Sequence, residues 1–466
     1  MRSIISRRGI IFLIALYLTV GLVFLLKLPN GLTVKEMTSY LFVLASYFIV
    51  GFIWIVQIDK HGFFIFEPAT MVIGLTFITF SVEPMISVIQ GDLGIGSFYV
   101  FDGCKKATII YMIAILIFMF GYYNGSNFME QKEDDGTIYQ NDRIQHLALV
   151  IWCGAFILQV VDLISNGYSL NYIFSLGSSG ALENVEDGGL GIFGNIRYFM
   201  VTALLYLDVY SKNKKSVWIL RMLSVLLSVL RGYRWIVVIY ILSPIVLYAY
   251  MKRKSPKMKT IIVLICTLAI IIGAMQFVRT SLREGNGIGN YNEEAQFNLA
   301  YIWGAFQGNF DLYKSLYGAV TYFPEQQFYT MGQQMILLTI ATIIPRSIWP
   351  SKPYSVIDTV YKPHFMGNDA VRGHWAYAQI SEFYIEFGVT GVIICMYLFG
   401  RFCKFLRELP LYENRTVHDV VVASFFFPML MQLVIRGYMP LNFWPIIFIL
   451  IPVFFMKYAV SYNEPI

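Results

Sequence analysis

The chain has 466 residues, of which 57% are hydrophobic and only 14% are charged. Soluble domains are nearer a quarter charged, so this composition excludes a soluble enzyme and a disordered linker. It favours one polytopic membrane body, a single domain that occupies residues 1–466. The formal net charge is +6, but the chain has no lysine-rich tract and no zinc-finger spacing, which argues against nucleic acid as a partner.

Apolar segments along the chain predict the membrane spans, because a helix needs about 20 mostly apolar residues to cross a bilayer. Twelve segments qualify: 9–26, 39–57, 63–87, 107–123, 145–164, 191–210, 217–230, 235–250, 260–278, 377–400, 418–435 and 441–456. The first follows three arginines, as a signal peptide would, but no small-residue cleavage site comes after it, so we expect an uncleaved span. An even number of spans puts both termini on one side of the membrane.

The positions of Lys and Arg predict the orientation of these spans, because short cytoplasmic loops carry an excess of both. Basic residues cluster at 2–8, 212–215, 252–259 and 401–407, all on the side of the N-terminus. We therefore expect both termini to be cytoplasmic. The opposite, external side then holds the long segment 279–376.

The segment 279–376 is far longer than an ordinary connection and is rich in aromatic residues, so we expect a folded external cap. Phe297, Tyr301 and Ala305 recur at helical spacing, as do Tyr313 and Tyr317, which predicts amphipathic helices at the membrane interface. The apolar stretch 334–344 is too short to span the membrane and predicts a re-entrant or interfacial helix.

Four arginines lie at external span ends: Arg231, Arg234, Arg279 and Arg283. Positive charge is disfavoured there, and guanidinium forks bind phosphate oxygens bidentately, so a lipid diphosphate is a fitting ligand. The alternative is that these side chains extend to the interface or pair with Glu284.

A second group of polar residues lies where the tenth span begins. Arg372 and His374 precede Glu382 and Glu386, which are one helical turn apart. Ionisable residues at the start of a span are candidates for function, and Glu382 or His374 could act as a general base. The alternative is that they are satisfied polar residues that pack the cap.

A third motif is a proline-rich loop that carries Arg346 and Lys352 beside Trp349. Cations next to an aromatic ring suit a phosphorylated or acidic glycan, although Pro and Trp also anchor interfacial loops.

Several catalytic signatures are absent from the sequence. It contains no Walker A, HExxH or GxSxG motif and no external DxD pair. Its five cysteines include no CxxC pair. The sequence therefore predicts no metal and no cofactor, and catalysis by arginine electrophiles with a His or carboxylate base.

Three of these motifs resemble those of the bacterial O-antigen polymerases of the Wzy type, which polymerise oligosaccharide repeat units. They are Leu230-Arg231-Gly232, Ile344-Pro345-Arg346 with Trp349-Pro350-Ser351-Lys352-Pro353, and Ser381-Glu382-Phe383-Tyr384-Ile385-Glu386-Phe387-Gly388-Val389-Thr390-Gly391. The last is similar to the glutamate-rich F-G-x-x-G span that follows the large external loop in this family. Through its topology the resemblance covers most of the chain.

The related O-antigen ligases offer a second, more distant resemblance. They carry arginines at external helix ends and a histidine where the loop meets a helix, positions that Arg231, Arg279 and His374 take here. His374 stands further from Gly388 than the ligase pattern has it, a departure that affects the histidine more than the arginines.

The resemblance implies a GT-C-like membrane glycosyltransferase that uses undecaprenyl-diphosphate-linked oligosaccharides, with membrane lipid and a chain-length regulator protein as further candidate partners. The growing glycan would leave its lipid diphosphate and pass to a sugar hydroxyl of the next lipid-linked repeat, with external aromatic residues stacking on sugar rings. A ligase that transfers from the lipid carrier, and a flippase or transporter of the same lipid-linked oligosaccharide, are the alternatives. A transporter should have broken helices in both halves of the chain, whereas the polar features here gather at one face.

Overall fold

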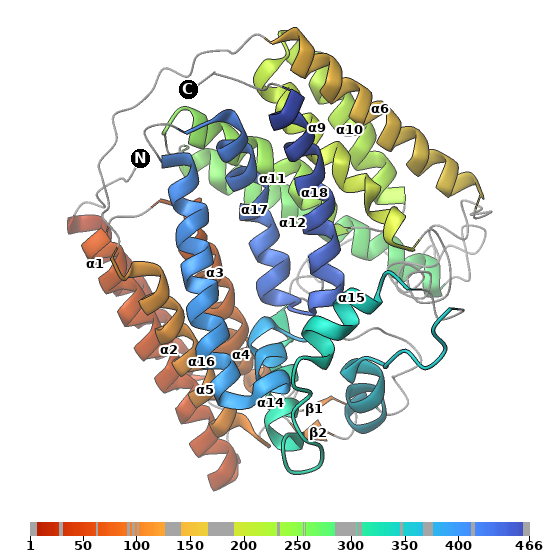
Figure 1. The fold of residues 1–466 in the computed structure, drawn as a ribbon. Coiled ribbons are helices and arrows are strands. Elements are labelled where there is room, and N and C mark those ends of the chain that lie inside the picture. Colours follow the sequence, from red (N-terminus) through yellow and green to blue (C-terminus); the bar gives the residue numbers. More distant parts are fainter. Residues whose placement is uncertain are drawn as a thin grey trace.

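A computed structural model describes residues 7–27, 31–61, 64–90, 94–95, 98–99, 102–125, 141–165, 191–230, 234–254, 256, 258–284, 304, 310–344, 348–366, 376–411 and 415–459. Within these ranges the chain is almost entirely helical (Figure 1). The exception is a short antiparallel pair of strands, β1 (Gly94–Ile95) and β2 (Phe98–Tyr99), in which Gly94 pairs with Tyr99.

The first part of the chain forms the helices α1 (Arg7–Leu26), α2 (Val34–His61), α3 (Pro68–Phe77), the π-helix η1 (Ile78–Val82), α4 (Glu83–Gln90), α5 (Cys104–Tyr123) and α6 (Asp142–Ser165). The middle part forms the 3-10 helix η2 (Gly191–Ile196), α9 (Arg197–Tyr210), α10 (Lys214–Leu230), α11 (Arg234–Met251) and α12 (Met258–Glu284).

The long segment between α12 and the next span contains α14 (Tyr313–Tyr322), the π-helix η4 (Gln333–Leu338), α15 (Thr339–Ala341) and the π-helix η5 (Ile357–Met366). The chain continues with α16 (Gln379–Glu408), the 3-10 helix η7 (Leu409–Leu411), α17 (Val417–Ile435) and α18 (Met439–Ala459).

Each of the twelve predicted spans overlaps a helix in the structure. Seven helical segments of the described ranges are long and apolar enough to cross a membrane, and three more are apolar but shorter. The seven are Val34–His61, Pro68–Gln90, Cys104–Tyr123, Asp142–Ile164, Gln379–Leu411, Val417–Ile435 and Met439–Tyr458. The prediction of an all-α, multi-pass membrane protein is therefore confirmed at this level.

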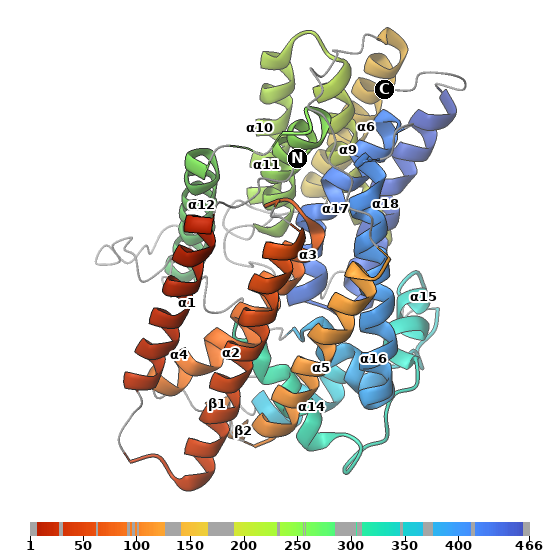
Figure 2. The same ribbon diagram turned by 90° about the vertical axis from the view of Figure 1, so that its left-hand side faces the viewer.

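The helices pack as two groups joined through α16 and α17. In the first group α16 runs along α5, and α1 and α2 pack beside them; in the second, α6 packs along α9, and α11 along α17 (Figures 1 and 2). Both views place α14, β1 and β2 at the opposite end of the bundle from the start of α1 and the end of α18.

Glycines let α16 and α5 approach closely. A Cβ atom on Gly121 would lie 2.5 Å from the carbonyl oxygen of Tyr397, and one on Gly400 would overlap the carbonyl oxygen of Phe118. Small residues at helix interfaces allow this backbone contact, which supplies much of the packing energy where no water is displaced.

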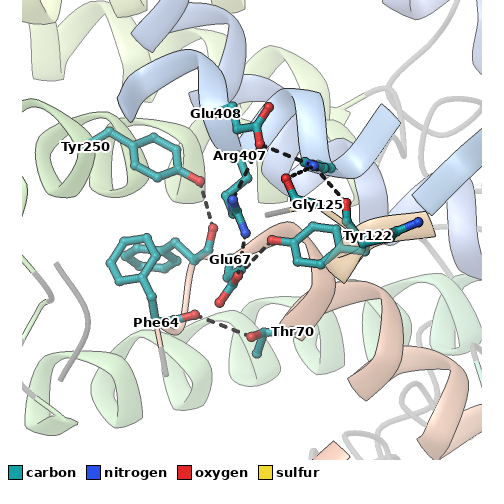
Figure 3. A network of polar contacts seen from close by, with 11 residues as sticks. Phe64, Glu67, Thr70, Tyr122, Gly125, Tyr250, Arg407 and Glu408 are labelled. Atoms are coloured by element: carbon teal, nitrogen blue, oxygen red, sulfur yellow. Dashed lines mark hydrogen bonds and ion pairs between the residues drawn. The ribbon is translucent and has the colours of Figure 1, made fainter. Parts of the chain in front are cut away.

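The C-terminal end of α16 is tied to its neighbours by the polar network in Figure 3. The Tyr122 hydroxyl donates to Oε1 of Glu67 at 2.8 Å, and a guanidinium nitrogen of Arg407 lies 4.0 Å from the same oxygen. Lys404 donates from Nζ to the carbonyl oxygen of Gly125 at 2.9 Å, beyond the end of α5. Paired and hydrogen-bonded, these buried charges join α3, α5 and α16 about seven helical turns from the start of α16.

The described part of the long segment is folded, but its tyrosines are not where the sequence pattern predicted. Tyr313 and Tyr317 do lie on a helix, α14, yet both are buried in the core, against α5 and α16, instead of facing the membrane interface. The Tyr317 hydroxyl lies 3.6 Å from Sγ of Cys104 on α5. Buried in this way, neither ring is available to stack on a sugar. Phe297, Tyr301 and Ala305 lie outside the described residues.

Candidate functional site

The site is built around a break near the start of α16. Gly388 has φ 65° and ψ −153°, a conformation open to glycine but not to residues with a side chain. A Cβ atom at this position would also lie 2.7 Å from the ring of Tyr329. The glycine of the F-G-x-x-G motif is thus required both for the backbone angle and for the contact with the loop.

The break connects α16 to the loop before η4. Backbone N–H groups of Thr330 and Met331 donate to the carbonyl oxygens of Ile385 and Glu386 at 3.0 and 2.9 Å. In an unbroken helix these carbonyls would bond four residues onward, to Val389 and Thr390. Because the helix is interrupted at Gly388, these two carbonyl oxygens accept hydrogen bonds from the loop instead.

Glu386 adds three side-chain hydrogen bonds to the same loop. Its Oε2 accepts from the Thr330 hydroxyl at 2.8 Å and from the Gly332 N–H at 2.6 Å, while its Oε1 accepts from the Met335 N–H at 2.5 Å. The carboxylate therefore caps the first turn of η4, where unpaired N–H groups and the positive end of the helix dipole favour a negative charge. Glu386 is fully buried, and its carboxylate positions the loop.

Glu382, one turn earlier, is buried as well and caps a different helix. Its Oε1 accepts the backbone N–H of Met439, the first residue of α18, at 2.9 Å. The two oxygens of a carboxyl group offer several acceptor positions, so this bond leaves capacity for other donors. Both glutamates are buried, and each binds the start of another helix.

Hydroxyl groups surround the first turn of α16. Oγ of Ser315 and Oγ of Ser381 are 2.8 Å apart, and the Tyr361 hydroxyl donates to the Ser315 carbonyl at 2.6 Å. Burial raises the pKa of Tyr361, and burial together with its neighbour Tyr384 raises the pKa of Tyr329 to about 12. Both phenols therefore stay neutral near pH 7 and act as hydrogen-bonding groups, not as charges.

The structure locates only some of the predicted basic residues. Arg234 is the first residue of α11, and Arg279 and Arg283 lie in the last turns of α12, which packs against α11. Lys352 is buried, and its N–H donates to the carbonyl oxygen of Trp349 at 3.1 Å. Arg231, Arg346, Arg372 and His374 lie outside the described residues. Of the four arginines predicted to bind a lipid diphosphate, three therefore lie at the ends of described helices.

The loop residues that donate hydrogen bonds to Glu386 were not predicted from the sequence. Thr330 and Gly332 do precede an apolar helical stretch, which is a common start signal for a helix. The sequence contains no sign, however, that the capping carboxylate comes from a residue 54 positions further along. Among the described residues no group of three His, Cys, Asp or Glu side chains could hold a metal ion.

Fold and site together define a polytopic all-α membrane protein in which the buried Glu386 bonds the long loop to the start of a broken helix and the buried Glu382 caps α18. The model of the family described as O-antigen polysaccharide polymerase Wzy matches residues 9–463, nearly the whole chain, and the protein belongs to this family. Membership implies a membrane glycosyltransferase-type polymerase that acts on lipid-linked oligosaccharide repeat units. No curated protein and no solved structure gives a significant match.

Proposed function

We propose that this protein polymerises undecaprenyl-diphosphate-linked repeat units into an O-antigen or a related surface polysaccharide. The observation that carries the proposal is the family match over residues 9–463. It is supported by the position of the glutamate-rich F-G-x-x-G motif, which forms the junction of the long loop with α16.

The reaction is a transfer to a sugar hydroxyl. The hydroxyl oxygen of the acceptor repeat forms a bond to the anomeric carbon of the growing glycan, while the bond from that carbon to the phosphate oxygen breaks. The lipid diphosphate leaves with the bonding electrons, and the hydroxyl proton passes to a base. Since the diphosphate is already a good leaving group, stabilising its charge is the main electrostatic requirement.

The arginines at the ends of α11 and α12 are proposed to meet this requirement. Arg234 starts α11, Arg279 and Arg283 end α12, and Arg231 precedes α11 by three residues. Guanidinium groups keep their charge and bind phosphate oxygens bidentately. Arg346, Lys352 and Arg372 are proposed to contribute further positive charge to the same substrate.

Glu382 and His374 are the two candidate bases. Glu382 lies in the first turn of α16, and among the described residues the Met439 N–H is its one backbone donor, so its other acceptor positions can take a sugar hydroxyl. His374 comes five residues before α16, and histidine is the side chain most often used for proton transfer near neutral pH.

The proposed setting is the bacterial inner membrane. All twelve apolar segments cross it in a GT-C-like arrangement, with both termini in the cytoplasm and the site facing outward. A chain-length regulator protein is proposed as a partner of the outer face. The opposite placement of α14 and the start of α1 in Figures 1 and 2 supports this orientation.

A reconstituted polymerisation assay tests the function. Purified protein given only undecaprenyl-diphosphate repeat units should build a ladder of longer lipid-linked glycans without nucleotide sugar, and the ladder should persist in EDTA. Arg231→Lys and Arg279→Lys keep the charge but lose the fork, so they should slow chain growth about 100-fold, the usual effect of removing one stabilising donor. Arg234→Lys and Arg283→Lys should be more tolerant, because two arginines suffice for one face of a diphosphate.

Other outcomes separate the alternative functions. Transfer to a foreign acceptor without any ladder would identify a ligase. Movement of lipid-linked repeats across vesicles without lengthening would identify a flippase. Normal ladders from both Arg231→Lys and Arg279→Lys would contradict the proposed role of the arginines while leaving the polymerase in place.

A further inference from the structure

The short helix formed by η4 and α15 has two unlike faces. Its inner face is held by polar contacts: Oε1 of Gln334 accepts the Val356 N–H, and the indole N–H of Trp444 donates to the Thr339 carbonyl, each at 2.9 Å. Its outer face and the turn before it expose apolar side chains: Phe328, Met331, Ile336, Leu337, Ile340 and Ile343. We call these six residues the outer apolar face.

This exposure is unusual for a segment outside the membrane spans. Phe328 is 85% exposed and Ile340 is 60% exposed, and the stretch 326–345 contains no Asp, Glu, Lys or Arg. Single exposed apolar residues are common on proteins, but a contiguous group of this kind marks a surface that something covers.

The neighbouring helices indicate what covers it. The η4–α15 helix packs against α16 and α18, beside the start of α16 in Figures 1 and 2. Just beyond Gly388, α16 presents its own exposed apolar stripe, which includes Val389, Ile394 and Leu398. The outer apolar face therefore belongs to a helix in contact with α16, whose own stripe faces acyl chains where α16 crosses the membrane.

We propose that the outer apolar face lies in the membrane, as an in-plane anchor at the boundary between head groups and acyl chains on the loop side. A helix of this kind typically sits about 5–10 Å below the head groups. A second copy of the protein fits this face less well than lipid does. It would have to cover the outer apolar face and leave the stripe of α16 exposed to lipid.

The same segment is the one that Glu386 holds. Met331 bonds the carbonyl of Glu386 through its N–H, and Met335, between the exposed side chains, bonds the carboxylate. The bilayer surface therefore fixes the depth of the loop in the membrane. Because Glu386 is hydrogen-bonded to this loop, the depth of the loop also fixes the position of the start of α16.

Depth-dependent quenching in nanodiscs tests the anchor. The full-length protein, with the exposed Cys153 and Cys266 replaced by serine, receives single cysteines at Ile336, Ile340 or Ile343 that carry a polarity-sensitive fluorophore. Glu325→Cys, an exposed charged position at the end of the charge-free stretch, is the aqueous control, and Leu398→Cys, 58% exposed within α16, is the deep control.

We expect lipids spin-labelled near the head group to quench a fluorophore at the three isoleucine positions several-fold more than one at position 325. At the three isoleucine positions, these lipids should also quench more strongly than lipids spin-labelled at the end of the acyl chain. Position 398 should show the reverse preference. Quenching equal to that at position 325 would show that the face lies in water and would overturn the proposal. Protection that appears only at high ratios of protein to lipid would show instead that a second copy covers the face. Neither measurement depends on polymerase activity, so the proposed function is tested separately.

Discussion

Glu382 and Glu386 are the same residue type, one turn apart, and differ in the donors that reach them. Glu386 receives three side-chain hydrogen bonds from the loop, whereas among the described residues Glu382 receives one, from Met439. Hydrogen bonds to a buried charge contribute about 1.5–3 kcal/mol each, so the two positions should respond differently to the same change.

Glu382→Gln can keep its one backbone bond, because the amide oxygen remains an acceptor, but the amide cannot take a proton. Melting of this variant should stay close to that of the unchanged protein, while the rate of chain growth falls about 100-fold or more if Glu382 is the base. Glu386→Gln turns an NH2 group toward converging donors and should lower the free energy of unfolding by about 2–4 kcal/mol. Thermal melts and single-turnover ladders measure both.

Full activity in Glu382→Gln would show that this carboxylate acts as a helix cap and not as the base. His374 would then be the base, and His374→Ala should be impaired in chain growth. Equal melting of the two glutamine variants would contradict the assigned role of Glu386.

At the scale of elements, close packing depends on glycines that the sequence pattern does not distinguish. Gly400 lies against the backbone of α5, whereas a Cβ atom on Gly154 in α6 would meet nothing within 4 Å. Both glycines lie inside long apolar helices. What differs is the partner helix, which is a tertiary property.

Alanine at these two positions should therefore change stability in opposite directions. Gly154→Ala should be neutral or stabilising by up to about 1 kcal/mol, because alanine is the better helix former. Gly400→Ala should destabilise by about 1–3 kcal/mol, the usual cost of overpacking. Unfolding in a mild denaturing detergent series compares them. Equal effects would mean that α5 and α16 are less tightly packed than described.

At the scale of the whole molecule, the membrane orientation is predicted from the positions of Lys and Arg. The structure has exposed positions at both ends of the bundle where this orientation can be tested. Gln326 is exposed in the turn after α14, and Lys60 is exposed at the end of α2. The two ends are far apart in Figure 2.

A cysteine at Gln326 should react with a membrane-impermeant thiol reagent in cells whose outer barrier alone is opened. A cysteine at Lys60 should react only after the inner membrane is broken, because the Lys and Arg clusters at 2–8, 212–215, 252–259 and 401–407 keep that end of the bundle in the cytoplasm. Gel-shift labelling measures both. The reverse pattern would invert the topology and place the site on the cytoplasmic face.

Much of the architecture could be predicted because its causes are local. The length and hydrophobicity of each apolar run are written in consecutive residues, and all twelve predicted runs are helical in the structure. The folded nature of the loop and the short helix after Gly332 could be predicted for the same reason. The burial of Tyr313 and Tyr317 could not, since helical spacing indicates which residues share a face but not whether that face meets lipid, sugar or protein.

The sequence by itself determined an all-helical, multi-pass membrane body and the candidate glutamates at the start of α16, because hydrophobic length and residue type are properties of the chain alone. Only the tertiary structure decided that Gly388 breaks this helix, that Glu386 caps η4, and that Glu382 caps α18. The physical reason is that a carboxylate acquires its role from the donors that surround it. Here those donors come from segments more than 50 residues away in the chain, which only folding brings within 3 Å.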